Sequence, residues 1–76
     1  MNRFFGMMPS NCVEITKSFK DSNNLKITIE AGPKGWTIMW ADHSSSYRDE
    51  DDTSSNNFKK AYDTAVNAVG PLKEIK

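Results

Sequence analysis

The stretch that decides the fold is LKITIEAGPKGWTIMW, residues 25–40. Apolar and polar side chains alternate over 25–31 and again over 36–41, which is typical of strands with one buried face. The segment 32–35, Gly-Pro-Lys-Gly, separates them and predicts a tight turn, because proline presets φ and glycine can adopt a left-handed conformation. The residues expected on the apolar face are Leu25, Ile27, Ile29, Trp36, Ile38 and Trp40.

The segments on either side extend this sheet. Residues 12–19 alternate in the same way, and the turn-forming run 21–24 connects them to the next strand. Residues 45–49, centred on Tyr47, predict a further strand, although serine and aspartate are poor strand formers. The sequence therefore predicts an antiparallel sheet of three or four strands in meander order, with one mostly polar face.

A helix is predicted over residues 57–70. Its apolar side chains follow the i, i+3, i+4, i+7 spacing of one stripe, and Gly70 followed by Pro71 ends it. The stripe matches the uncovered apolar face of the sheet, so the helix is expected to lie across that face. The stripe consists of Phe58, Ala61, Tyr62, Ala65, Val66 and Val69.

These elements predict a single small α+β domain over residues 1–76. Its expected parts are an N-terminal arm at 1–10, the antiparallel sheet at 11–49, an acidic and polar loop at 50–57, the C-terminal helix at 57–70, packed on one face, and a tail at 71–76.

Composition narrows the class of function. Ten basic and ten acidic residues give a net charge of zero, whereas nucleic-acid binders usually carry a basic surplus. The lone Cys12 favours a reducing compartment, and the sequence shows neither a signal-peptide core nor a spanning helix. We therefore expect a cytoplasmic protein without membrane contact, and nucleic acid is not the favoured partner.

Few residues could carry chemistry. Asp42, His43 and Ser44 have the residue types of a hydrolase triad, but sequential neighbours rarely converge as a triad requires. Cys12 has no adjacent histidine, and the acidic run lacks the spacing and the glycine of a calcium loop. The sequence thus predicts no catalytic, cofactor or metal site and indicates a protein that is not an enzyme.

Two surfaces remain as candidate partner-binding sites. The first is acidic, because between 42 and 52 only Arg48 opposes Asp42, Asp49, Glu50, Asp51 and Asp52. The second is the apolar arm with Phe4 and Phe5. Both favour a small protein-binding module that acts as an inhibitor, adaptor or regulator, of the anti-defence type carried by phages or mobile elements. A basic, nucleic-acid-handling protein would suit the acidic surface.

Two alternatives stay open. A free sheet edge could add a strand from a partner or from a second copy, which would give a homodimer. A nucleic-acid-binding domain would use lysines on the polar sheet face, such as Lys20 and Lys26.

Overall fold

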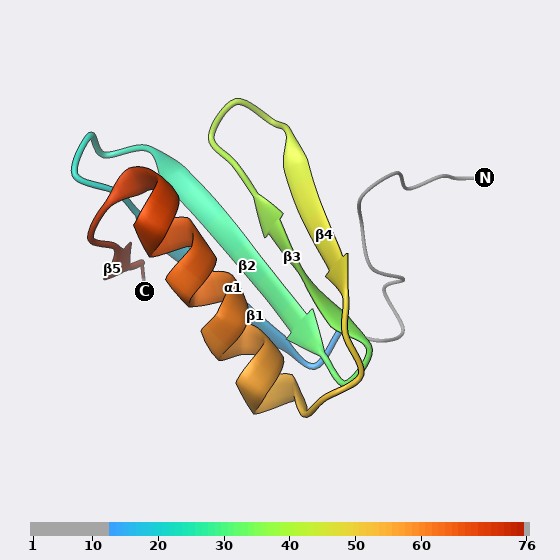
Figure 1. Cartoon of the computed structure of the whole chain (residues 1–76). Coiled ribbons are helices and arrows are strands. Elements are labelled where there is room, and N and C mark those ends of the chain that lie inside the picture. The colour runs from blue at the N-terminus through green and yellow to red at the C-terminus, as the bar shows by residue number, and fades with distance from the viewer. Residues whose placement is uncertain (1–12, 76) are drawn as a thin grey trace.

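A computed structural model describes residues 13–75 of the chain. It contains a sheet in the order β4-β3-β2-β1-β5, in which every neighbouring pair is antiparallel, and one helix, α1 (Figure 1). The strands are β1 (Ile15–Lys20), β2 (Lys26–Gly32), β3 (Gly35–Met39), β4 (Ser45–Asp49) and β5 (Lys73–Glu74), and α1 spans Ser54–Val69. The predicted α+β fold with one C-terminal helix on the sheet is confirmed.

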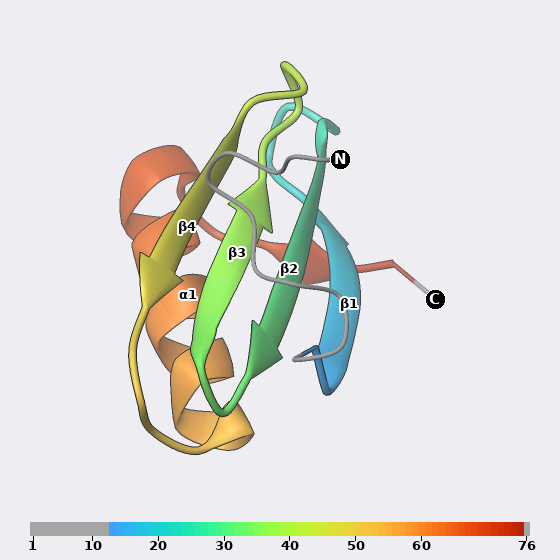
Figure 2. The ribbon, with the colours of Figure 1, turned by 90° about the vertical axis from the view of Figure 1, so that its right-hand side faces the viewer.

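Helix α1 covers one face of the sheet (Figure 2). The register explains which side chains it buries, because residues directly opposite each other on neighbouring strands point to the same face. Ile29 lies opposite Ile38 and Lys17, and Ala31 lies opposite Trp36. The buried apolar core consists of Phe19, Ile27, Ile29, Ala31, Trp36, Ile38, Ala61 and Ala65.

Helix α1 starts earlier than the predicted boundary at 57. Thr53 is its N-cap: the residue is extended, and its hydroxyl accepts a hydrogen bond from the backbone N–H of Asn56 at 3.1 Å. At the other end, Gly70 has a φ of 88° and donates its backbone N–H to the carbonyl of Val66 at 2.8 Å. The glycine stop that the sequence predicts is therefore present.

Two details of the sheet differ from the prediction. Strand β5 was not predicted; it pairs with β1 at Phe19 and Lys20, and the Ile75 N–H that follows it donates to the Ser18 carbonyl at 2.8 Å. Leu25 was expected on the buried face but is 49% exposed, because it closes the turn before β2 begins. Its backbone N–H donates to the Asp21 carboxylate at 2.9 Å, and its carbonyl accepts from the Asp21 N–H at 3.1 Å. The predicted fourth strand is present over the expected residues.

Candidate functional site

The two ends of the sheet are built differently. We call the closed end the group formed by the β2–β3 turn (Gly32–Gly35), residues 50–53, and Asn57 and Lys60 of α1. We call the open end the group formed by the β1–β2 turn (Asp21–Leu25), the β3–β4 turn (Trp40–Ser44) and Val69. Most of the predicted acidic residues lie at the closed end, whereas Asp42 lies at the open end (Figure 1).

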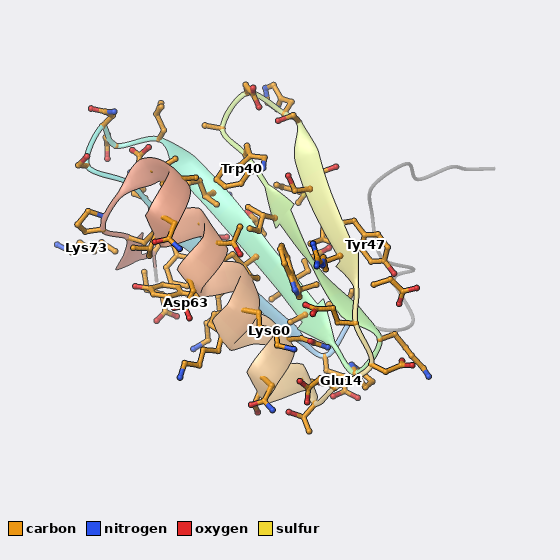
Figure 3. The ribbon with its side chains drawn as sticks, viewed as in Figure 1. Glu14, Trp40, Tyr47, Lys60, Asp63 and Lys73 are labelled. Carbon is orange, nitrogen blue, oxygen red and sulfur yellow. The ribbon has the colours of Figure 1, made fainter. Side chains whose placement is uncertain are left out.

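At the closed end, acidic side chains are paired within the molecule. Lys60 Nζ lies 2.9 Å from Asp52 Oδ2 and 3.5 Å from Glu50 Oε1, and Lys34 Nζ lies 3.4 Å from Asp51 Oδ1. The indole N–H of Trp36 donates to Glu50 Oε2 at 2.8 Å. In Figure 3, Lys60 extends from α1 toward this loop. Residues 50–52 therefore make internal contacts and are also part of a negative surface.

The pKa values of this network follow from its hydrogen bonds. The Lys60 ammonium, with help from the Asn56 amide and the Thr53 N–H, lowers the pKa of Asp52 to about 2. The hydrogen bond from Trp36 lowers the pKa of Glu50, and the bond to Asp52 raises the pKa of Lys60. All three groups are held in their charged forms near neutral pH.

Asn57 joins this network to the sheet, and sequence reasoning missed it. The side chain is fully buried, and its amide Nδ2 donates to the carbonyl of Gly32 at 2.6 Å and to that of Glu50 at 3.1 Å. It satisfies two backbone carbonyls where the turn, the loop and the helix meet. The available signal was its position four residues before Ala61, on the buried line of the helix.

At the open end, an apolar surface is exposed. The half-exposed Leu25 lies beside Trp40 and Ala41, and these three residues line a hollow of about 440 Å³ on the helix side of the sheet. Its other lining residues are Ile27, Val69, Asp21 and Asp42. Figure 3 shows Trp40 near the end of β3, and its indole N–H donates to Ser46 Oγ of β4 at 2.9 Å.

A second hollow, of about 390 Å³, shares the same three residues. It lies toward the face opposite α1, and its further lining residues are Asn24, Lys26, Thr28, Met39 and His43. Leu25, Trp40 and Ala41 therefore form a ridge between two hollows, which we call the apolar ridge. Binding sites are commonly lined by aromatic and aliphatic side chains, so the two hollows are candidate binding sites.

The two lysines named for the alternative of nucleic-acid binding, Lys20 and Lys26, are neighbours in the sheet. Lys20 and Lys26 lie directly opposite each other where β1 and β2 begin to separate, on the face opposite α1. Two like charges in this position repel each other, so the pair costs stability unless an anion lies nearby.

Asp42, His43 and Ser44 do not have the geometry of a hydrolase triad. The Asp42 carboxylate accepts directly from the Ser44 hydroxyl at 2.6 Å and from the Ser44 N–H at 3.0 Å, which lowers the pKa of Asp42. A triad requires the histidine between these two groups, whereas His43 is exposed on a turn with a φ of 71°. These contacts stabilise the turn.

The remaining predicted residues are placed as follows. Asp49 ends β4 and is exposed. Phe4 and Phe5, the rest of the arm at 1–10 and Cys12 lie outside the described residues. Within residues 13–75, no group of histidine, cysteine, aspartate and glutamate side chains could hold a metal ion. In the same range, no helix has both the length and the apolar character needed to span a membrane.

Comparisons of this chain with protein-family models, with curated proteins and with solved structures find no match.

Proposed function

We propose that this chain is a small, non-enzymatic protein-binding module that contacts its partner through the open end. The observation that carries the proposal is the apolar ridge, where Leu25 is 49% exposed next to Trp40 and a hollow lies on either side. Single exposed apolar residues are common on protein surfaces and need no explanation. Tryptophan is one of the residue types that most often anchor protein interfaces, and the exposed Leu25 extends the apolar surface around Trp40.

The acidic loop contributes less to partner binding in this proposal than the sequence suggested, because lysines of the same chain already pair with most of its acids. A partner that binds Glu50 or Asp52 must compete with Lys60, and one that binds Asp51 must compete with Lys34. Asp49 has no such competitor among the described ion pairs. The acidic-loop contact thus stays part of the proposal through Asp49, and changing Asp49, Glu50, Asp51 and Asp52 together to their amides tests it. Unchanged binding would remove it.

In this role the module acts as an inhibitor, adaptor or regulator of its partner. Such an action needs a stable surface and no reaction, which suits a chain of 76 residues. The outer edge of β4 offers a further contact for an added strand, from the partner or from a second copy, because β4 is the last strand of the described sheet on that side.

The test is affinity capture from a lysate of the source organism with immobilised wild-type chain and two variants. Leu25→Asp places a charge on the apolar ridge without entering a strand. Ser55→Asp adds the same charge to the first turn of α1, at an exposed site away from the open end. We expect one protein to bind the wild type and Ser55→Asp but not Leu25→Asp. Equal capture by all three chains would refute the open end as the binding surface.

A second candidate function rests on the Lys20–Lys26 pair. We propose binding of single-stranded nucleic acid on the face opposite α1 as the alternative, since a phosphate would relieve the repulsion between the two lysines. Fluorescence anisotropy with a labelled oligonucleotide tests it. Affinity must fall steeply with added salt, and Lys26→Ala must weaken binding more than Lys59→Ala does. Absence of salt-dependent binding would remove this alternative.

A further inference from the structure

The hollow on the helix side of the open end has both apolar and acidic residues in its lining. Ile27, Trp40 and Val69 are apolar lining residues, and Asp21 and Asp42, which we call the rim acids, line the hollow from two different turns. Among the described residues that line this hollow, none is basic. This differs from the closed end, where Lys60 and Lys34 pair with the acids.

Both rim carboxylates are held in place by their turns. Asp21 Oδ1 accepts from the backbone N–H groups of Asn23 at 2.8 Å and Leu25 at 2.9 Å. Asp42 Oδ1 accepts from the Ser44 N–H and hydroxyl. The hydrogen bonds described for the two residues all use Oδ1, so Oδ2 takes no part in these turn contacts. Carboxylates that are already oriented lose little entropy when they bind a cation.

The end of α1 adds to the same preference. Val69, the last residue of the helix, lines the hollow, so the negative end of the helix dipole lies beside it. The last turn of α1 contains no basic residue that would offset this charge. Two carboxylates and a helix C-terminus therefore favour a cation next to an apolar wall.

We propose, on the basis of the proposed function above, that this hollow receives an arginine side chain of the partner protein. The aliphatic stem lies against Leu25 and Val69, the guanidinium plane lies over the Trp40 indole, and its N–H groups donate to Asp21 and Asp42. Arginine fits better than lysine because its planar, weakly hydrated head can stack on an aromatic ring and donate to two carboxylates at once.

The test uses the full chain, labelled with ¹⁵N, and two blocked peptides followed by NMR. The first peptide is acetyl-Gly-Leu-Arg-Leu-Gly-amide, and the second replaces arginine with citrulline, which has the same shape without the charge. We expect the arginine peptide to shift the Trp40 indole signal and the Leu25 amide signal saturably. The citrulline peptide should bind about tenfold more weakly or worse, as the loss of a charge-assisted contact implies.

Two variants assign the effect to the rim. Asp21→Asn with Asp42→Asn keeps the side-chain oxygens that accept the turn hydrogen bonds but removes both charges. Asp63→Asn with Glu74→Gln makes the same change in net charge at two exposed residues that do not line the hollow. We expect the first double variant to lose about tenfold in affinity for the arginine peptide and the second to bind like the wild type.

The outcomes separate this inference from the proposed function. Equal shifts with the arginine and citrulline peptides, no shift with either, or equal affinity of the two double variants would overturn the arginine site. A lysine peptide that binds as tightly as the arginine peptide would also overturn it. If the protein captured through Leu25 still binds Asp21→Asn with Asp42→Asn at full affinity, the arginine site is wrong and the binding module stands. If capture never depends on Leu25, the proposed function fails.

Discussion

The closed end and the open end of the sheet contain similar residue types and use them in opposite ways. Each end has a tryptophan, acidic side chains and one end of α1. At the closed end, Trp36 is 7% exposed, Glu50 and Asp52 are paired with Lys60, and Asn57 ties the loop to the sheet. At the open end, the side-chain hydrogen bonds described for Asp21 and Asp42 within residues 13–75 come from their own turns. Acidic residues occur at both ends, so their presence alone does not identify a binding surface. The two ends differ in whether a lysine of the same chain is paired with the acids.

The largest expected loss of stability comes from a substitution at Gly35, in the turn of the closed end. Gly35 has a φ of 149°, and a Cβ added there would lie 2.2 Å from the backbone oxygen of Arg48. Gly35→Ala should therefore lower the free energy of unfolding by about 3 to 5 kcal/mol. Gly70→Ala, at a φ of 88° with open space around it, should cost about 1 kcal/mol. Urea unfolding of both variants measures the difference, and equal losses would contradict the described approach of β4 to Gly35.

The next effect compares two aliphatic residues near the open end. Ile27 is 1% exposed and belongs to the core, whereas Leu25 is half exposed on the ridge. Ile27→Ala should cost about 2 to 5 kcal/mol, and Leu25→Ala should cost about 1 kcal/mol or less. Thermal or chemical denaturation checks both. A large loss for Leu25→Ala would show that the ridge is part of the core and would weaken the proposed binding surface.

A smaller effect is expected at Asn57. Asn57→Ala leaves the carbonyls of Gly32 and Glu50 without their donor, which should cost about 2 to 3 kcal/mol. The control is Asn67→Ala, at an exposed position of α1, where we expect a change within about 0.5 kcal/mol. The denaturant midpoints of the two variants measure this difference in stability. Matching midpoints would mean that Asn57 does not join the helix to the sheet.

The smallest expected effect is the pH dependence of the closed end. The pKa of Asp52 is about 2 in the folded state, below its ordinary value of 3.8. This difference stabilises the fold above pH 3.8 and is lost as the pH falls toward about 2. Lys60→Met should raise the pKa of Asp52, lower the melting temperature near neutral pH, and flatten its dependence on pH in that window. Lys59→Met is the control, and melting curves across the acid range that coincide for the two variants would contradict the pairing.

Sequence reasoning predicted the fold further than the site. Alternation over 25–41 and the helical stripe contain the information for β2, β3 and α1, because burial of one face determines both patterns. Strand β4 was also predicted where it lies, despite its polar residues. Strand β5 could not be predicted, because Lys73 and Glu74 have no apolar pattern. These two residues pair with β1 because the helix returns the chain to that edge of the sheet.

The placement of the acids depends on tertiary structure. Asp42 and Asp49 are close in sequence, but β4 separates them, so one lies at each end of the sheet. Lys60 pairs with Asp52 and Glu50 because the loop that leads into α1 lies beside the second turn of the helix. Leu25 was predicted to be buried by the same alternation that places Ile27 correctly, because the alternation does not show where the turn closes. Because Leu25 is exposed and not buried, it forms part of the apolar ridge, which the sequence did not predict.

The two tryptophans also give each end its own optical signal. Trp36 and Trp40 are the chain's two tryptophans; Trp36 is almost fully buried beside Glu50, and Trp40 lies in the hollow of the open end. Replacing either one with phenylalanine leaves a single tryptophan, whose emission reports on one end alone. The emission of Trp40 should therefore respond to an occupied open end while that of Trp36 stays constant, so occupancy and unfolding can be followed separately in one unlabelled chain.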